Sequence, residues 1–162
     1  MMARALVLAA VVVAACSRRE AEPAAAPAAG PAVTLERTPC FGTCPVYTVA
    51  ISRSGEVTFD GKRHVAQAGQ ATAKIPPERV DSLLAELAAA GYFGFADKYV
   101  VDEPACGMYA TDLPTVITSA VRDGETKTIR HDRGCSAAPP ELSQLEQRID
   151  EVAGTGRWVG RR

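Results

Sequence analysis

The sequence has few of the residues on which most catalytic and metal sites are built. It holds two histidines and one tryptophan, and aromatic residues make up 6% of its 162 positions. Neither sign of charge dominates, because 18 lysines and arginines face 19 aspartates and glutamates, which gives a net charge of −1. No basic stripe of the kind that binds nucleic acid is present. The composition predicts a globular protein, and nucleic acid is not expected among its partners.

Sequence motifs for common cofactors and nucleophiles are also missing. There is no P-loop, no dinucleotide fingerprint, no G-x-S-x-G elbow and no C-x-x-C-H haem motif. The two histidines, His64 and His131, each lie among charged neighbours, which predicts surface positions for both. We therefore expect no catalytic residue and no cofactor, and the sequence favours a protein that is not an enzyme.

The first residues predict export and lipid attachment. Arg4 provides a positive start, and residues 5–15 are an uninterrupted run of small and apolar side chains. This run is shorter than the roughly 20 residues that cross a bilayer, but it suits the core of a signal peptide. Cys16 follows a Val-Ala-Ala sequence, which is similar to the bacterial lipobox. We expect residues 1–15 to be removed as a lipoprotein signal peptide and Cys16 to carry the lipid.

Such an anchor places the protein in the cell envelope. Each acyl methylene buried in the bilayer contributes about 0.8 kcal/mol, so several chains anchor a protein stably. Ser17, in place of an aspartate after the cysteine, favours the outer membrane, facing the periplasm. Residues 16–32 form an Ala- and Pro-rich linker without a large apolar side chain, and the folded domain is expected over residues 33–160. The predicted partners are the membrane, through the lipid, and another envelope protein.

Hydrophobic patterning in the first half of the domain predicts strands followed by a helix. Apolar residues alternate with small or polar ones over residues 47–52 and again over 57–60, which indicates two strands of a hairpin. A turn at Gly61-Lys62 and a third strand over residues 63–68 are expected next. The Pro-Pro pair at 76–77 then starts a helix, which Gly91 ends. The apolar stripe of this helix comprises Val80, Leu83, Leu84, Leu87 and Ala88.

The second half shows the same order. A strand with Ile117 and Val121 is followed by an Asp-Gly turn at 123–124 and a returning strand over 127–131. A second Pro-Pro-Glu sequence starts a helix with the apolar residues Leu142, Leu145, Ile149 and Val152. The two Pro-Pro-Glu copies lie 63 positions apart (140 minus 77), so we consider a hairpin-helix pseudo-repeat beside a chance likeness of two common units.

The predicted fold class is α+β, with an antiparallel sheet of four to five strands and two amphipathic helices on one of its faces. The opposite face must then be polar, covered by another element, or a binding site. Three residues suggest that it is polar: Ser52, Thr58 and Thr118.

Four cysteines remain once lipidation has used Cys16, namely Cys40, Cys44, Cys106 and Cys135. An even number in an oxidising compartment predicts two disulfides, for which three pairings can be drawn. We favour the first cysteine with the second, which closes a small loop around a glycine, and the third with the fourth. The second bridge would connect the long segment after the first helix to the segment before the second helix.

Three segments of the chain resemble one bacterial family. They are residues 34–47, with a Cys-Phe-Gly-Thr-Cys-Pro core, residues 111–115, with the sequence Thr-Asp-Leu-Pro-Thr, and residues 149–158. In these segments the chain is similar to the DUF6438 family, and the likeness extends from Val33 to about Val159. The resemblance implies an exported or lipid-anchored bacterial protein and brings no established activity. The cysteines at 106 and 135 look like an addition of some relatives only, which fits a bond between them.

The segment from Ala96 to Thr115 is long for a connection within a small domain, and such loops are often functional. Its carboxylates suit a calcium ion but lack the D-x-D-x-D spacing of a dedicated loop. The simplest interpretation is a disulfide-pinned loop that covers the sheet edge. We also consider that this loop and the loop at residues 40–44 form a partner-binding surface. Its contact residues would be Phe41, Tyr99, Tyr109 and Asp112.

The sequence therefore favours a non-enzymatic binding or accessory module of the cell envelope. The alternative is a thiol-redox or metal-dependent enzyme that uses Cys40 and Cys44. Against it, their C-x-x-x-C segment precedes a strand, so no helix N-terminus is placed to lower the pKa of a thiol. In the metal-dependent form, zinc would be held by these two cysteines together with His131 and Cys135. A third hypothesis is a ligand carrier or inhibitor that uses the open face of the sheet.

Overall fold

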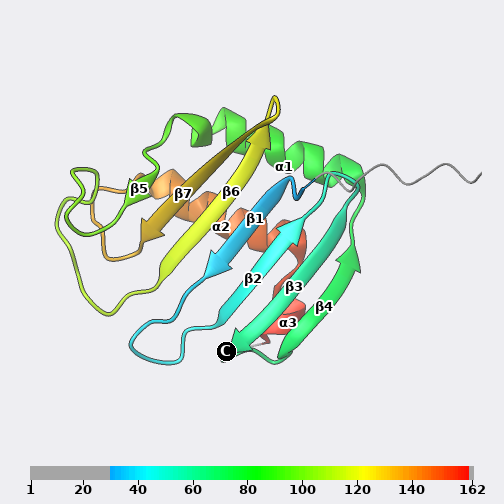
Figure 1. Cartoon of the computed structure of the whole chain (residues 1–162), viewed down its shortest axis with the longest axis horizontal. Coiled ribbons are helices and arrows are strands. Elements are labelled where there is room, and N and C mark those ends of the chain that lie inside the picture. The colour runs from blue at the N-terminus through cyan, green and yellow to red at the C-terminus, as the bar shows by residue number, and fades with distance from the viewer. Residues whose placement is uncertain (1–29, 161–162) are drawn as a thin grey trace, which may run out of the picture.

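The computed structural model describes residues 30–160, which form a twisted sheet with helices behind it (Figure 1). The sheet has seven strands in the order β4-β3-β2-β1-β6-β7-β5. Neighbouring strands are antiparallel, except that β5 and β7 are parallel. The strands are β1 (Val33–Arg37), β2 (Val46–Ile51), β3 (Glu56–Arg63), β4 (Gly69–Lys74), β5 (Lys98–Tyr99), β6 (Thr115–Arg122) and β7 (Glu125–Asp132).

Two long helices lie on the same side of the sheet in Figure 1, and they confirm the two predicted from the Pro-Pro pairs. They are α1 (Pro77–Ala89) and α2 (Pro140–Ala153), and each has a proline in its first turn, where the missing N–H is not needed. Gly91 and Gly154 follow the helices with φ angles of 83° and 69°, a left-handed conformation that glycine adopts without strain. Two short helices, η1 (Tyr92–Gly94) and α3 (Gly156–Val159), follow these glycines.

The α+β class is confirmed, but the predicted sheet of four to five strands is too small. The hydrophobic pattern does not predict β1, which lies between β2 and β6 and joins the two hairpin units into one sheet. Only two of its side chains, Val33 and Leu35, face the core, which is too short an alternation to distinguish the strand from the end of the linker. Strand β5 has just two residues and carries no pattern of its own.

The turn predicted at Gly61-Lys62 is wrong, and so is the strand predicted over residues 63–68. Strand β3 continues to Arg63, and β4 begins only at Gly69. Gly61 lies inside β3, and a Cβ atom at this position would be 2.1 Å from the carbonyl oxygen of Gln67. Glycine is therefore required by the close approach of the chain where it folds back after the strand, and not by a turn.

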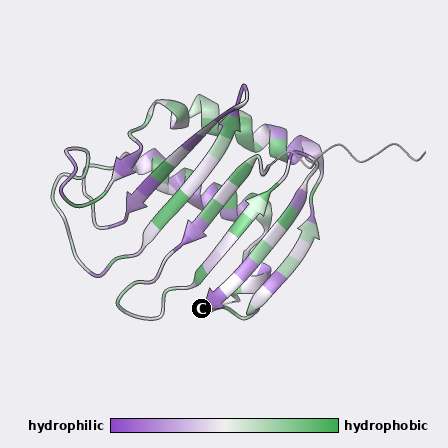
Figure 2. Cartoon of the chain, in the orientation of Figure 1, coloured by the Kyte–Doolittle hydropathy of each residue, from purple (hydrophilic) through white to green (hydrophobic). Residues whose placement is uncertain are grey.

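The strands alternate between an apolar face and a polar one (Figure 2). The apolar face lies against the helices, and its fully buried side chains include Val33, Leu35, Val49, Ile51, Val57, Phe59, Val116 and Ile129. Thr58 is exposed on the opposite face, as predicted. The prediction for Thr118 is wrong, because it is 1% exposed on the covered face, where its hydroxyl is 2.9 Å from the hydroxyl of Tyr92.

The predicted signal peptide, the predicted lipidation site Cys16 and most of the predicted linker lie outside the described residues. Within residues 30–160, no helix combines the length and the apolar character that crossing a membrane requires.

An ion pair connects α1 and α2. Arg148 Nε donates a hydrogen bond to Glu86 at 2.7 Å and Nη2 donates a second at 3.1 Å, and these bonds lower the pKa of Glu86 below its ordinary value of 4.5. A lowered pKa in the folded state means that the pair stabilises the fold above the unfolded pKa. This stabilisation is lost as the pH falls through the folded pKa.

We expect Glu86→Gln to reduce the free energy of unfolding by about 0.5–1 kcal/mol near neutral pH, since the pair is partly screened by solvent. The difference from the wild type should narrow as the pH is lowered toward 3. Urea denaturation across this pH range measures it, with Glu125→Gln as the control, because Glu125 has no ion pair within the described residues. A gap that stays constant with pH would contradict the assignment.

Candidate functional site

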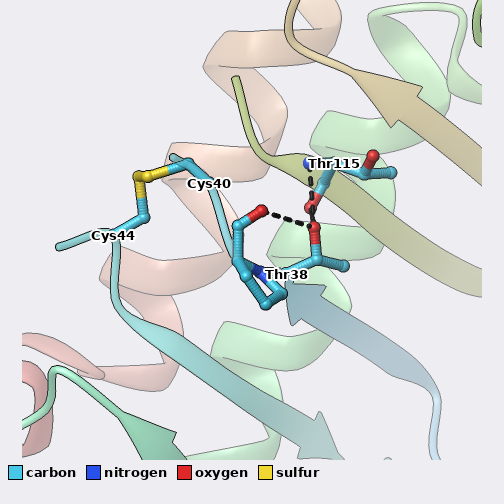
Figure 3. The surroundings of a disulfide bond; sticks show 5 residues. Thr38, Cys40, Cys44 and Thr115 are labelled. Carbon is cyan, nitrogen blue, oxygen red and sulfur yellow. Dashed lines mark hydrogen bonds between the residues drawn. A yellow bond between two sulfur atoms is a disulfide. The ribbon is translucent and has the colours of Figure 1, made fainter. Parts of the chain in front are cut away.

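The connection from β1 to β2 is closed by the Cys40–Cys44 disulfide and fastened to the start of β6 (Figure 3). The Cα atoms of the two cysteines are 5.7 Å apart. The Thr38 hydroxyl donates to the carbonyl oxygen of Thr115 at 3.0 Å and accepts from the Thr115 amide at 2.9 Å. This pair of side-chain bonds extends the pairing of β1 and β6 by one step, at the point where the loop begins.

The second disulfide joins Cys106 to Cys135, and both predicted pairings are therefore found. It ties the long loop between β5 and β6 to the segment that follows β7. Backbone bonds support it, since the Ser136 amide donates to the carbonyl oxygen of Met108 at 2.9 Å and the Met108 amide donates to the Ser136 hydroxyl at 3.0 Å. The backbone of Tyr109 also forms an isolated antiparallel β-bridge with that of Cys135, which adds a further contact between the loop and this segment.

The four residues of the zinc hypothesis do not converge in the structure. Cys40 and Cys44 bond to each other, Cys135 bonds to Cys106, and His131 pairs with Glu146. Among residues 30–160, no group of three or more histidine, cysteine, aspartate or glutamate side chains is arranged to hold a metal ion.

The large exposed apolar side chains of the described domain all lie on these two loops, at one end of the sheet (Figure 1). Phe41 is 88% exposed on the first loop, and Met108 is 81% exposed on the second. The Phe41 amide donates to the carbonyl oxygen of Asp112 at 3.1 Å, which joins the two loops. We call the exposed set the loop surface, and it comprises Phe41, Val101, Met108, Tyr109 and Leu113.

The structure places three of the four predicted contact residues, Phe41, Tyr109 and Asp112, in exposed positions on the two loops. Tyr99 is different, because it is 5% exposed on β5 and its hydroxyl accepts a hydrogen bond from the Ala96 amide at 3.1 Å. It therefore does not belong to the exposed surface, and that part of the prediction is wrong. Sequence reasoning missed Val101, Met108 and Leu113, although large apolar residues in a long loop were a usable signal.

Directly behind the loops, the helix-covered side of the sheet becomes polar. One row across the strands runs from Tyr47 through Arg37 and Val116 to His131. Asp150 and Glu146 face this row from α2, where a spacing of four residues places both on one side of the helix.

Asp150 binds the first half of this row. Arg37 donates to its Oδ2 from Nε at 2.8 Å and from Nη2 at 2.6 Å. Its Oδ1 accepts hydrogen bonds from the hydroxyls of Tyr47 at 2.7 Å and Thr155 at 2.8 Å. Each carboxylate oxygen thus has two donors, which fills the acceptor capacity of the group.

Burial and the charge of Asp150 raise the pKa of the Tyr47 hydroxyl well above its ordinary value. Burial acts to lower the pKa of Arg37, but the attraction of Asp150 and Tyr47 outweighs it and raises that pKa. Tyr47 therefore remains a hydrogen-bond donor, and Arg37 remains charged, throughout the physiological pH range.

Glu146 binds the other half of the row. It is fully buried, and its Oε1 lies 2.6 Å from Nδ1 of His131, while Arg133 Nη1 donates to its Oε2 at 3.3 Å. His131 is itself 3% exposed, so the prediction of a surface position for it is wrong. The prediction for His64 holds, because that residue is exposed.

A cavity of about 410 Å³ opens beside this polar row and next to the first loop. The two guanidinium groups, Arg37 and Arg133, line it together with Asp150. Its apolar wall is formed by Cys44, Pro45, Leu113, Pro114 and Val159.

A second cavity, of about 490 Å³, lies on the open face of the sheet. Its lining includes one threonine from each of β1 to β4 together with apolar side chains, and Glu36 and Asp60 are its charged residues. This depression is the place that the ligand-carrier hypothesis requires.

The protein is thus an α+β domain in which helices cover one face of the sheet and disulfides anchor two loops at one end of it. The chain belongs to the family described as a domain of unknown function (DUF6438), whose model matches residues 31–153, and this match confirms the resemblance found in the sequence. A comparison with curated proteins found no match.

We expect Asp150→Asn to lower the free energy of unfolding by about 2–3 kcal/mol, because Arg37 then keeps its charge in a half-buried site without a counter-charge. Asp123→Asn is the matched control, since its side chain is 93% exposed and should change stability by less than about 0.5 kcal/mol. Urea denaturation of both variants tests the expectation, and equal stabilities would contradict it.

Proposed function

We propose that the protein is a non-enzymatic binding or accessory module of the cell envelope. In this proposal, lipid on Cys16 holds the chain on the outer membrane, facing the periplasm, and the domain contacts another envelope protein through the loop surface. The observation that carries the proposal is the placement of the large exposed apolar side chains, which gather on two loops anchored by disulfides.

The exposure of these side chains has an energetic meaning. Burying a side chain such as that of Phe41 or Met108 contributes about 1.5–3 kcal/mol, and the domain on its own leaves both in water. Aromatic residues and methionine are also enriched at protein interfaces. A partner that covers the loop surface would gain this contribution.

The loops are prepared for such contact, because two disulfides and the bonds of Thr38 restrict their motion before any partner arrives. Ordering flexible loops is one of the main costs of association, so restricted loops favour affinity.

The charge around the loop surface indicates the kind of partner. Asp102 and Asp112 are exposed and have no ion pair within the described residues, and Tyr109 donates to the carboxylate of Asp132 at 3.2 Å. Interfaces place opposite charges against each other, which fits a partner with an apolar patch and basic residues at its rim.

The lipid anchor is tested by membrane fractionation. Cys16→Ser removes the acceptor of the lipid, so we expect the variant in the soluble fraction and the wild type in the membrane fraction. Ser17→Ala is the matched control and should stay with the membrane. A Cys16→Ser variant that remains on the membrane would contradict lipidation at this residue.

Partner binding is tested by pull-down of the tagged full chain from detergent-solubilised envelopes. We expect Phe41→Ala and Tyr109→Ala each to weaken recovery of a partner about tenfold or more, as truncation of a central interface residue does. Gln70→Ala, an exposed truncation on β4 at the other edge of the sheet, should recover it as the wild type does. Equal recovery of every partner by all three variants would exclude the loop surface.

A further inference from the structure

The cavity beside the loops offers hydrogen-bond donors without matching acceptors, and this imbalance does not depend on the proposed function. A guanidinium group has five N–H donors. Within the described residues, Nη1 of Arg37 has no partner, and neither Nε nor Nη2 of Arg133 has one. Both arginines line the cavity, so each has donors left for a ligand.

The acceptors of the cavity are already used. Asp150 is the one carboxylate among the lining residues, and donors from Arg37, Tyr47 and Thr155 fill both of its oxygens. The carboxylate that holds Arg133 is that of Glu146, which is fully buried and is not part of the lining. A bound cation would therefore find no free side-chain oxygen, whereas an anion would find free donors.

The apolar residues that line the cavity indicate which kind of anion fits it. Pro45, Leu113, Pro114 and Val159 present hydrocarbon and no side-chain polar group. The volume of about 410 Å³ lies at the small end of the range for ligand pockets. A free inorganic anion would leave this apolar wall uncovered, but a carboxylate attached to an apolar group would cover it.

We propose that this cavity binds an organic carboxylate that carries a compact apolar group. Arg133 and Arg37 donate hydrogen bonds to the carboxylate, because the N–H donors of a planar guanidinium match the two oxygens of a carboxylate. The apolar group of the ligand contacts Leu113 and the two prolines. Each guanidinium is also neutralised by a carboxylate of α2, so recognition rests on directed donors and apolar contact more than on net charge.

The test uses NMR titration of the isotope-labelled full chain with N-acetyl-leucine. We expect saturable shifts of the Arg133 Nε–H signal and of the methyl signals of Leu113 and Val159. N-acetyl-leucinamide, which lacks the charge, and inorganic phosphate, which lacks the apolar group, should each bind at least about tenfold more weakly. A further titration uses 4-methylpentanoate, which has the carboxylate and the compact apolar group but no amide. Comparing its affinity with that of N-acetyl-leucine shows whether the cavity prefers a free acid or a peptide terminus.

Two variants locate the site. Arg133→Gln removes the guanidinium and should weaken the binding of N-acetyl-leucine at least about tenfold. Arg130→Gln, the same change at an exposed position of β7, should leave this binding unchanged. Leu113→Ala, at a half-exposed loop position, should weaken N-acetyl-leucine about threefold to tenfold and leave acetate unaffected, so it decides the question if Arg133→Gln fails to fold.

The proposal is overturned by any of three results. These are the absence of a saturable shift with N-acetyl-leucine, equal affinity for the acid and its amide, or phosphate binding as tight as that of the acid. None of them depends on whether a protein partner binds Phe41 and Tyr109, so this test and the pull-down can fail independently.

Discussion

Two carboxylates on one face of α2 hold the loop end of the sheet in place. Asp150 fixes Arg37 at the end of β1, and Glu146 fixes His131 on β7 and Arg133 just beyond it. The central strand and the second hairpin are thereby attached to the same helix. A buried ion pair adds little stability compared with apolar packing, but removing one partner from it is costly. The position of α2 over these strands is therefore set by charge as well as by its apolar stripe.

The two loops start from the strands that α2 holds in place, and the two disulfides fix the path of the loops themselves. The two bridges join cysteines 4 and 29 residues apart, and in the chain-entropy model they contribute about 2 and about 4 kcal/mol respectively. The longer bridge thus does more for the stability of the fold, whereas the shorter one mainly fixes the local path of the chain around Phe41. Both act at the same end of the molecule, where large apolar side chains remain in water.

The sequence predicts well the elements whose signal is local and long. The helices α1 and α2 each combine a Pro-Pro start, a regular apolar stripe and a terminal glycine, and the Asp-Gly turn between β6 and β7 has φ angles of 53° and 84°, as its residues favour. Strand β1 has no such local signal, since its pairing with β6 joins residues 79 (116 minus 37) to 87 (120 minus 33) positions apart. The burial of His131 has no local signal either, because its neighbours in sequence are charged and its partner Glu146 lies 15 residues away on α2.

The sequence nevertheless contains one indication that Glu146 is buried. Glu146 directly follows Leu145 and lies beside the stripe formed by Leu142, Leu145, Ile149 and Val152, where a helix with a purely apolar contact face would have no glutamate. A buried carboxylate needs a partner, so this glutamate, together with the sole histidine of the second hairpin, marked a polar contact between helix and sheet. What the sequence could not provide was its location behind the loops. Apolar side chains at these positions would stabilise a helix on a sheet at least as well. The ion pairs found there instead hold Arg37 and Arg133 in a fixed arrangement beside the cavity, which is the arrangement that the proposed carboxylate site requires.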